Sequence, residues 1–364
     1  MTRVKYTITI HTSRGNKIRN TISSVRYQNI PTAVLEAGGG DYIRFYQQKV
    51  IIKASRNRKR LNLEDILEYR QNTIYAQIFK TVLYLYLGNE RRVEIRSIDV
   101  ETPKNKESRI INPKSQPLSR DFKLRNAIPA SVMDVIWEES TKSEYLRRAV
   151  SHYLRGKTSK DRYFVFERYW RAFEQLAYWH HYHSPLPKKP EETEAMRSIR
   201  TFIDSNPPSL SKTISFVDKV GSRQIDKLHW RKLIIANYPY TGDVRQINLV
   251  IDNLIRKNQD IRLVRMFRKA CDIHKKGLVD HALKPVADTL INSYVTTHAK
   301  NNANVLALIV CKYCYFYRNK MFHGQEADYT FSFSNHTEDD DITDFLNSVL
   351  ELLVFDLICG FNIL

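Results

Sequence analysis

The spacing of hydrophobic residues differs between the N-terminal and C-terminal parts of this chain of 364 residues, and that difference constrains the fold most. In the N-terminal part, apolar and polar residues alternate, as in Val4–Thr12 (VKYTITIHT) and Arg91–Glu101 (RRVEIRSIDVE). Alternation of this kind is typical of a β-strand with one buried face. From about Ser131 the spacing becomes helical. We therefore expect an α+β N-terminal module followed by a predominantly all-α bundle.

The N-terminal module, residues 1–102, is expected to contain two further strand segments. A turn at Gly15 and Asn16 leads into Lys17–Tyr27, which we expect to form a hairpin with the first strand. Residues Lys49–Ala54 (KVIIKA) indicate another strand. With the strand at 91–101, these segments predict a small sheet.

The same module has one predicted helix and one glycine-rich loop. Asn62 is a suitable N-cap with Asp65 three positions later, and it predicts a helix that runs to Leu87. The loop at residues 37–41 (AGGGD) lacks the Gly-Lys-Ser/Thr ending of a phosphate-binding loop. Hydrolysis of nucleoside triphosphates is therefore excluded as a function.

A segment rich in proline, serine, asparagine and lysine, residues 103–130, predicts a linker between the two domains. The helical domain is expected to span residues 131–364. Its predicted helices are Asp161–His183, Glu194–Ile203, Leu210–Val220, Val244–Arg256, Ile261–Lys275, Pro285–Thr296, Asn304–Phe322 and Ile342–Phe361.

Positive charge is concentrated in the N-terminal third of the chain. Residues 1–125 hold 25 Lys and Arg against 11 Asp and Glu, a net +14 of the total +19. A basic region of this kind points to a polyanionic partner, most often nucleic acid. The alternative is a solvated basic surface beside a small sheet. If RNA binds there, we expect phosphate contacts from Arg44, Lys49, Lys53, Arg56, Arg58, Lys59 and Arg60, and base stacking on Tyr42, Phe45 and Tyr46.

The chain shows no sign of secretion, of a membrane span or of a metal site. It has only four cysteines, its N-terminus has no apolar signal region, and no apolar run reaches transmembrane length. We therefore expect a cytoplasmic protein. His180 and His183 share a helical spacing and Cys311 and Cys314 form a CxxC pair, but neither pair has the further ligands that zinc requires. We expect no metal and no cofactor.

One short segment carries the chemistry. Residues Tyr317–Gly324 (YRNKMFHG) place Arg318 five positions before His323, with Asn319 directly after the arginine. A fixed cation beside a titratable imidazole suffices to cleave RNA without a metal, because the ribose 2′-OH supplies the nucleophile. The alternative is a salt-bridged arginine and a capping histidine at a helix end.

The segment resembles the Arg–polar–His motif of HEPN (higher eukaryotes and prokaryotes nucleotide-binding) ribonucleases. Residues Phe166–Leu176 (FERYWRAFEQL) resemble the first helix of the ApeA-like HEPN group, with its embedded glutamate at Glu174. The resemblance covers roughly Tyr145–Leu364 and implies an HEPN-like bundle with insertions around residues 188–260. Glu174 either pairs with Arg318 across the bundle or is an ordinary, partly buried acid.

The resemblance implies a homodimer in which both Arg–His pairs share one composite cleft. It implies an endoribonuclease that acts as a toxin or abortive-infection effector in antiviral defence, with RNA as its partner and an antitoxin, a guide RNA or a phage trigger as its control. In this scheme His323 moves protons, Arg318 stabilises phosphate charge, and Asn319 orients the phosphate or the imidazole. The alternative function is a catalytically silent RNA-binding or assembly protein.

Overall fold

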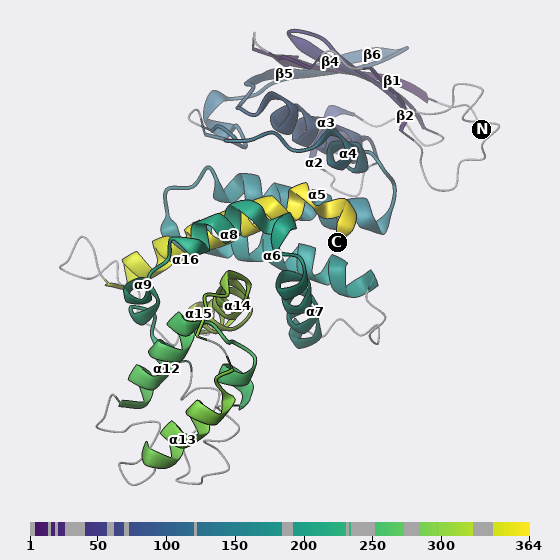
Figure 1. Ribbon diagram of the computed structural model, residues 1–364. Coiled ribbons are helices and arrows are strands. Elements are labelled where there is room, and N and C mark those ends of the chain that lie inside the picture. The colour runs from purple at the N-terminus through teal and green to yellow at the C-terminus, as the bar shows by residue number, and fades with distance from the viewer. Residues whose placement is uncertain are drawn as a thin grey trace. The chain divides into compact units, whose positions relative to one another are not determined.

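The computed structural model describes residues 4–13, 16–18, 21–25, 41–56, 62–68, 73–119, 122–183, 192–230, 233, 252–272, 284–296, 298–322 and 338–364 (Figure 1). The chain forms two compact units. The first comprises Met1–Lys160 together with Ile358–Leu364, and the second comprises Asp161–Leu357. The first unit contains an antiparallel sheet and the second is helical, which confirms the predicted order of an α+β part followed by a mostly helical part.

Among the described residues of the first unit, six antiparallel strands form a single sheet in the order β2-β3-β4-β1-β5-β6. Their bounds are Val4–Thr12 (β1), Thr21–Val25 (β2), Asp41–Phe45 (β3), Lys49–Arg56 (β4), Ile95–Thr102 (β5) and Asn105–Ile110 (β6). The predicted hairpin between β1 and the segment 17–27 is wrong. Strand β2 pairs with β3, and β1 lies between β4 and β5.

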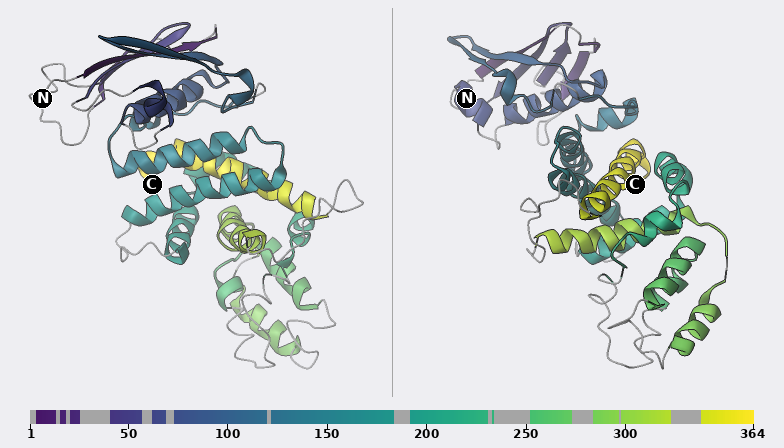
Figure 2. Two further views of the ribbon diagram at one scale, coloured as in Figure 1. Left: turned by 180° about the vertical axis from the view of Figure 1, so that it is seen from behind. Right: turned by 90° about the vertical axis from the view of Figure 1, so that its left-hand side faces the viewer.

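Alternation along the strands gives the sheet one buried face. The side chains on this face are nearly all apolar and include Tyr6, Ile8, Ile10, Ile43, Phe45, Val50, Ile52 and Val100. Two helices, α2 (Leu63–Glu68) and α3 (Thr73–Asn89), lie on that side of the sheet (Figures 1 and 2). The opposite face carries the intervening polar side chains, as expected for an antiparallel sheet with one solvated face.

The helix that follows Asn62 begins as predicted. The Asn62 side chain accepts a hydrogen bond from the Asp65 backbone N–H at 2.7 Å, and the Asp65 carboxylate accepts one from the Asn62 N–H at 3.1 Å. This reciprocal capping satisfies N–H groups that the helix itself cannot pair. The single helix predicted to Leu87 is instead described as two, and the residues between α2 and α3 lie outside the described ranges.

The linker predicted over residues 103–130 is wrong for Asn105–Ile110. These residues form β6, which pairs with β5 along its whole length. The sequence NKESRI has no buried position. Strand β6 lies at the edge of the sheet, where polar and charged side chains discourage pairing with another chain. The next helices, α4 (Ala130–Val135) and α5 (Thr141–Gly156), belong to the first unit rather than to the helical one.

The final segment of the chain, Ile358–Leu364, also belongs to the first unit. Phe361 is fully buried, and Lys142 on α5 donates a hydrogen bond to the Asn362 side chain at 2.8 Å. The Lys142 ammonium also lies 5.8 Å from the centre of the Phe361 ring. The first unit is therefore built from two separate stretches of sequence.

Most of the helices predicted for the second unit are present. They are α6 (Arg162–His183), α7 (Glu192–Ser205), α8 (Ser211–Asp218), α12 (Ile261–Asp272), α13 (Lys284–Tyr294), α14 (Asn302–Leu308), α15 (Tyr315–Phe322) and α16 (Glu338–Cys359). A short helix, α9 (Ser222–Asp226), was not predicted. Of the predicted helix at 244–256, only Asp252–Arg256 is described, as a π-helical turn. Within the described residues, no helix is both long and apolar enough to span a bilayer.

The predicted apolar helix at 304–322 is present with one irregularity. A π-helical segment, Ile309–Cys314, joins α14 to α15, so the stretch runs without a break from Asn302 to Phe322. A π-helical turn shifts the faces of the residues that follow it relative to a regular helix, and such turns are frequent at functional sites. The segment lies directly before the helix that carries Arg318.

Candidate functional site

Two helices distant in sequence meet at Arg318. The arginine lies on α15, and its Nη2 atom is 3.5 Å from Oε1 of Glu174 on α6. The arginine side chain is 27% exposed and the glutamate side chain is 12% exposed. Of the two roles left open for Glu174, the structure therefore shows the ion pair with Arg318.

Aromatic packing between α6 and α15 brings these two residues together. Phe166 meets Tyr317 edge to face with ring centres 5.1 Å apart, and Trp170 lies 6.3 Å from Tyr315. Phe166 and Trp170 are fully buried. Large aromatic side chains bury much area and prefer defined ring geometries, so this contact fixes how the two helices lie against each other. The aromatic character of α6 therefore positions the charged pair.

Asn319 contributes to the same cluster. Arg318 Nη1 donates a hydrogen bond to Asn319 Oδ1 at 2.9 Å. The guanidinium therefore contacts a carboxylate from α6 and an amide from its own helix. A separation of 3.5 Å is longer than the 2.7–2.9 Å typical of a charge-assisted hydrogen bond, so Glu174 orients the arginine by an ion pair rather than by a close fork of hydrogen bonds.

The remaining residues of the motif lie outside the described part of the chain. His323 and Gly324 follow Phe322, the last described residue of α15. The structure thus brings together Arg318, Asn319 and Glu174, while the position of His323 remains a prediction from the sequence.

Three acidic residues at the start of α16, Asp339, Asp340 and Asp341, form ion pairs within the helical unit. Asp339 Oδ1 lies 2.9 Å from His229 Nε2, Asp340 Oδ1 lies 2.8 Å from Arg162 Nη1, and Asp341 Oδ2 lies 3.4 Å from Lys227 Nζ. These carboxylates occupy the first turn of α16, where negative charge also favours the helix.

The charges of Asp339 and Asp340 at the start of α16 act on Tyr163 of α6. Burial raises the pKa of Tyr163 to about 12, and the nearby negative charges of Asp340 and Asp339 add to this rise. The hydroxyl is therefore neutral throughout the physiological range, so it can donate a proton in a hydrogen bond but cannot act as a base.

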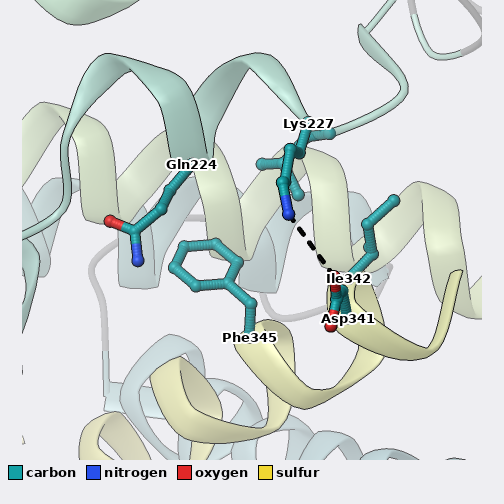
Figure 3. A pocket seen from close by; sticks show the side chains of 6 residues that line it. Gln224, Lys227, Asp341, Ile342 and Phe345 are labelled. Atoms are coloured by element: carbon teal, nitrogen blue, oxygen red, sulfur yellow. Dashed lines mark hydrogen bonds and ion pairs between the residues drawn. The ribbon is translucent and has the colours of Figure 1, made fainter. Parts of the chain in front are cut away.

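A small open pocket lies beside the start of α16 (Figure 3). Its volume is about 230 Å³, and the Lys227–Asp341 ion pair stands at its rim. Leu228, Ile342 and Phe345 supply an apolar lining, and Gln224 faces the same space. The pocket has one ion pair and no described cluster of titratable groups, so it does not resemble an active site.

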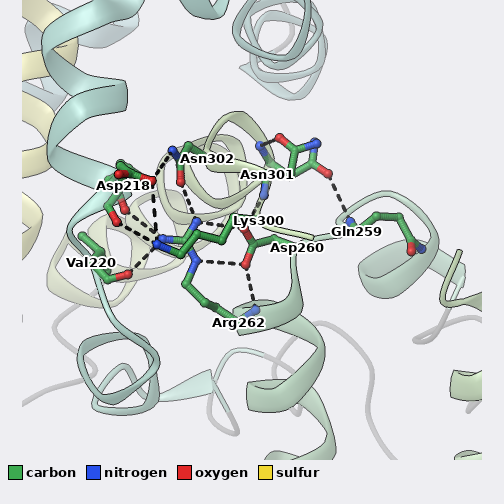
Figure 4. Close-up of polar contacts among 10 residues, drawn as sticks. Asp218, Val220, Gln259, Asp260, Arg262, Lys300, Asn301 and Asn302 are labelled. Carbon is green, nitrogen blue, oxygen red and sulfur yellow. Dashed lines mark hydrogen bonds and ion pairs between the residues drawn. The ribbon is translucent and has the colours of Figure 1, made fainter. Parts of the chain in front are cut away.

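A second polar cluster joins three elements of the helical unit (Figure 4). Arg262 and Asp260 are almost fully buried and lie 2.8 Å apart, and Arg262 Nη1 also donates to the Val217 and Val220 carbonyls. Asn302 accepts from Arg262 at 2.7 Å. Every contact in this cluster is internal, so we assign it to the fold rather than to catalysis.

Asp218 lies at the exposed side of this cluster. It accepts a hydrogen bond from the Asn302 side chain at 3.0 Å and lies 3.8 Å from the Lys300 ammonium. The Asn302 hydrogen bond and then the Lys300 charge lower the pKa of Asp218. Both groups favour the ionised carboxylate, which is the expected form at neutral pH.

The two pairs of residues with metal-ligand spacing, His180 with His183 and Cys311 with Cys314, are part of the packing of the helical unit. His180 lies 2.8 Å from the Ser198 hydroxyl, and burial lowers its pKa. Cys311 and Cys314 are buried in the π-helical segment, and burial raises the pKa of the Cys311 thiol to about 12. Within the described ranges, no group of three or more His, Cys, Asp or Glu side chains is placed to share a metal ion.

The predicted RNA-contacting residues have different surroundings. Arg44, Lys49 and Lys53 are exposed on the solvated face of the sheet. Arg56 instead forms a two-pronged pair with the buried Asp41, with both contacts at 2.8 Å. The remaining three predicted contacts, Arg58, Lys59 and Arg60, lie outside the described residues.

Of the three aromatic residues predicted to stack bases, Phe45 is excluded. It is buried and packs against Tyr84 with ring centres 5.4 Å apart. Tyr42 and Tyr46 are half-buried on the solvated face. Lys5 shares that face and was not among the predicted contacts, although the strand alternation at 4–12 would have shown it.

The chain was compared with protein-family models, with curated proteins and with solved structures, and none of the three comparisons finds a match. The geometry around Arg318 and the sequence motif therefore carry the functional argument.

Proposed function

We propose that this protein is a metal-independent endoribonuclease whose active site is built around Arg318 and His323. The observation that carries the proposal is the ion pair between Arg318 on α15 and Glu174 on α6. In the HEPN-like pattern stated above, an acid on the first aromatic helix accompanies the Arg–His motif. The pair supports that pattern because the two residues come from elements far apart in sequence.

The proposed reaction uses the ribose 2′-OH as nucleophile. His323 removes the proton from this hydroxyl and returns a proton to the leaving 5′-oxygen, as imidazole can do near neutral pH. The 2′-oxygen attacks the adjacent phosphorus and the bond to the 5′-oxygen breaks. The products carry 2′,3′-cyclic phosphate and 5′-hydroxyl ends. DNA lacks the 2′-OH and resists cleavage.

Arg318 stabilises the charge that grows on the phosphate oxygens. Its guanidinium is always protonated and its planar donors match phosphate geometry. Glu174 fixes the direction of the guanidinium from one side and Asn319 from the other. Pre-oriented charge of this kind lowers a transition-state barrier because no reorganisation is needed during the reaction. Glu174 is therefore a positioning residue in this proposal.

A homodimer that joins two Arg318–His323 pairs in one cleft is part of the proposal, as is a role as a toxin or abortive-infection effector. RNA is the substrate, and an antitoxin, a guide RNA or a phage trigger would control it. Size-exclusion chromatography with light scattering tests the dimer: a mass of twice 42.9 kDa supports it, and a monomer at micromolar concentration contradicts it.

The decisive experiment is cleavage of total RNA and tRNA in EDTA by the wild type, Arg318→Ala and His323→Ala. We expect each variant to lose about 100- to 1,000-fold in rate, as when a transition-state donor is removed. Arg171→Ala is the control, because Arg171 is an exposed arginine on α6 that pairs with Glu167. Cyclic-phosphate ends made by wild type and control alone support the proposal.

Two results would contradict this assignment. If Arg318→Ala and His323→Ala cut as well as wild type, the chemistry lies elsewhere. If the wild type binds RNA but leaves it intact, even in cells infected with phage and lacking an antitoxin, then the alternative of a silent RNA-binding or assembly protein is correct.

A further inference from the structure

The solvated face of the sheet carries a band of positive charge. The register defines it: Lys49 and Lys53 lie on β4, Arg44 lies on β3 opposite Ile51, and Lys5 lies on β1 opposite Ser55. All four basic side chains are exposed. We call this surface the basic sheet face. We propose that the basic sheet face binds a single strand of nucleic acid.

The spacing of the four cations suits a single nucleic-acid strand that runs parallel to β4. Residues four apart on a strand are separated by about 14 Å, and neighbouring strands are about 4.8 Å apart. Lys49 and Lys53 therefore lie at two points along β4, Arg44 lies between them on β3, and Lys5 extends the patch beyond Lys53 on β1. A patch of this length spans roughly three or four phosphates, given the usual reach of lysine and arginine side chains.

The charge on this face is not neutralised within the described part of the chain. There, no carboxylate pairs with Lys5, Arg44, Lys49 or Lys53. Instead, the Arg44 guanidinium and the Lys49 ammonium both lie against the Tyr46 ring, at 5.1 and 5.5 Å from its centre. Two cations beside one ring repel each other, so an anion placed between them would be bound favourably.

The other half of the same face differs and sets a boundary to the site. Asp99 on β5 lies 3.1 Å from His11 and 3.7 Å from Lys106. Partial burial opposes ionisation of Asp99, but hydrogen bonds from Ser108 and His11 outweigh it and lower its pKa. This carboxylate would repel a phosphate backbone. The nucleic-acid strand should therefore contact β3, β4 and the Lys5 end of β1, and not β5.

An aromatic side chain stands among the four cations. Tyr42 is directly opposite Lys53 in the register and is half-buried, so part of its ring faces solvent. Proteins that bind single strands without sequence preference combine a basic track with aromatic rings on which bases stack. The stacking ring favours an unpaired strand over a duplex, whose bases are already stacked. It also favours nucleic acid over an anionic membrane, which has no bases.

This inference does not depend on the proposed function, and its test avoids cleavage. The 364-residue chain is titrated into a fluorescent 12-nucleotide 2′-O-methyl RNA, which has no free 2′-OH, and into DNA of the same sequence. Fluorescence anisotropy is recorded between 50 and 200 mM NaCl. A protein that fails to cleave RNA but still binds these probes would contradict the catalytic proposal and leave this one standing.

Three variants localise the binding. Arg44→Ala/Lys53→Ala should weaken binding about tenfold or more and make the salt slope shallower by about 1.4, since each phosphate contact contributes about 0.7 on a single strand. Tyr42→Ser should weaken it roughly tenfold while leaving the salt slope unchanged. The matched control, Lys104→Ala/Lys106→Ala, removes two exposed charges from the other end of the sheet. Thermal melting checks that each variant is folded.

Loss confined to the face variants supports the proposal, whether RNA and DNA bind alike or RNA binds more tightly. Equal loss in the control overturns it, because any surface charge would then serve. Binding to vesicles of phosphatidylserine without binding to either oligonucleotide also overturns it and would assign the face to a membrane surface.

Discussion

The cations of the basic sheet face and several cations of the helical unit are used in opposite ways. On the basic sheet face, Lys5, Arg44, Lys49 and Lys53 have no carboxylate partner among the described residues. In the helical unit, Arg162, Lys227, Arg262 and Arg318 each lie within 4 Å of one. A cation with an internal carboxylate holds elements together, whereas a cation without one retains its charge for a ligand.

Arg318 stands between these two extremes. Its contact with Glu174 is longer than that of Arg262 with Asp260, 3.5 Å against 2.8 Å, and its side chain is far more exposed, 27% against 4%. Arg262 therefore stabilises the fold, whereas Arg318 is held in place by Glu174 and remains accessible to a ligand. Four measurements can break or sharpen this distinction.

The largest effect is expected from Arg262→Ala. This change leaves the fully buried Asp260 carboxylate without its partner and also removes donors to two backbone carbonyls. Breaking a buried pair on one side costs about 3–5 kcal/mol of unfolding free energy. Chemical denaturation measures it. Arg256→Ala, which breaks an exposed pair with Asp252, serves as the control, and an equally small change in both would remove the distinction.

Glu174→Gln should reduce cleavage about 10- to 100-fold, because a misdirected guanidinium loses transition-state contact. The expected loss falls on kcat more than on KM, and Glu174→Asp should recover part of it. Glu167→Gln is the matched control, since Glu167 pairs with the exposed Arg171 on the same helix. Wild-type kcat in Glu174→Gln would mean that the Arg318 pair is purely structural.

Asp356→Asn should stabilise the helical unit at neutral pH. Burial raises the pKa of Asp356, although hydrogen bonds from the Thr213 N–H and hydroxyl oppose the rise. A raised folded-state pKa contributes stability below the unfolded value, about 3.8, and that stability is lost as pH rises through the folded pKa. The melting temperature of Asp356→Asn should thus exceed that of wild type at pH 7, and the gap should close below pH 4.

The smallest effect is expected from Lys227→Ala. Both partners of the Lys227–Asp341 pair are about half exposed, and exposed pairs contribute less than about 1 kcal/mol. Denaturation of this variant at low and high salt should differ little from wild type. A loss above 2 kcal/mol would show that the acidic start of α16 depends on this contact and is not merely a favourable helix terminus.

Local patterns predicted the elements well because their causes are local. Alternation at 4–12 and 49–54 gave β1 and β4, and the Asn62–Asp65 cap gave the start of α2. Aromatic and apolar periodicity gave α6 and α16. The possibility that Glu174 pairs with Arg318 was also open from the sequence, since an acid on an aromatic helix needs a partner when buried.

The errors arose where pairing is decided at long range. Strand β2 was assigned to the wrong neighbour because hairpin formation with β1 competes with pairing to β3, and nothing within residues 17–27 decides between them. Strand β6 was missed because both of its faces are polar. The π-helical turn at 309–314 has no local signal, and the bond between Arg56 and Asp41 could not be separated from a phosphate contact by charge alone.

The return of the chain to the first unit at Ile358 sets an order for its folding. Strands, α3 and α5 of that unit are synthesised early, but the surface that receives Phe361 and Asn362 stays vacant until the whole helical unit has been made. The first unit therefore cannot complete its packing on the ribosome until the helical unit and residues 358–364 have been synthesised. A chain interrupted before Ile358 would expose apolar surface on the very unit that we propose to hold nucleic acid.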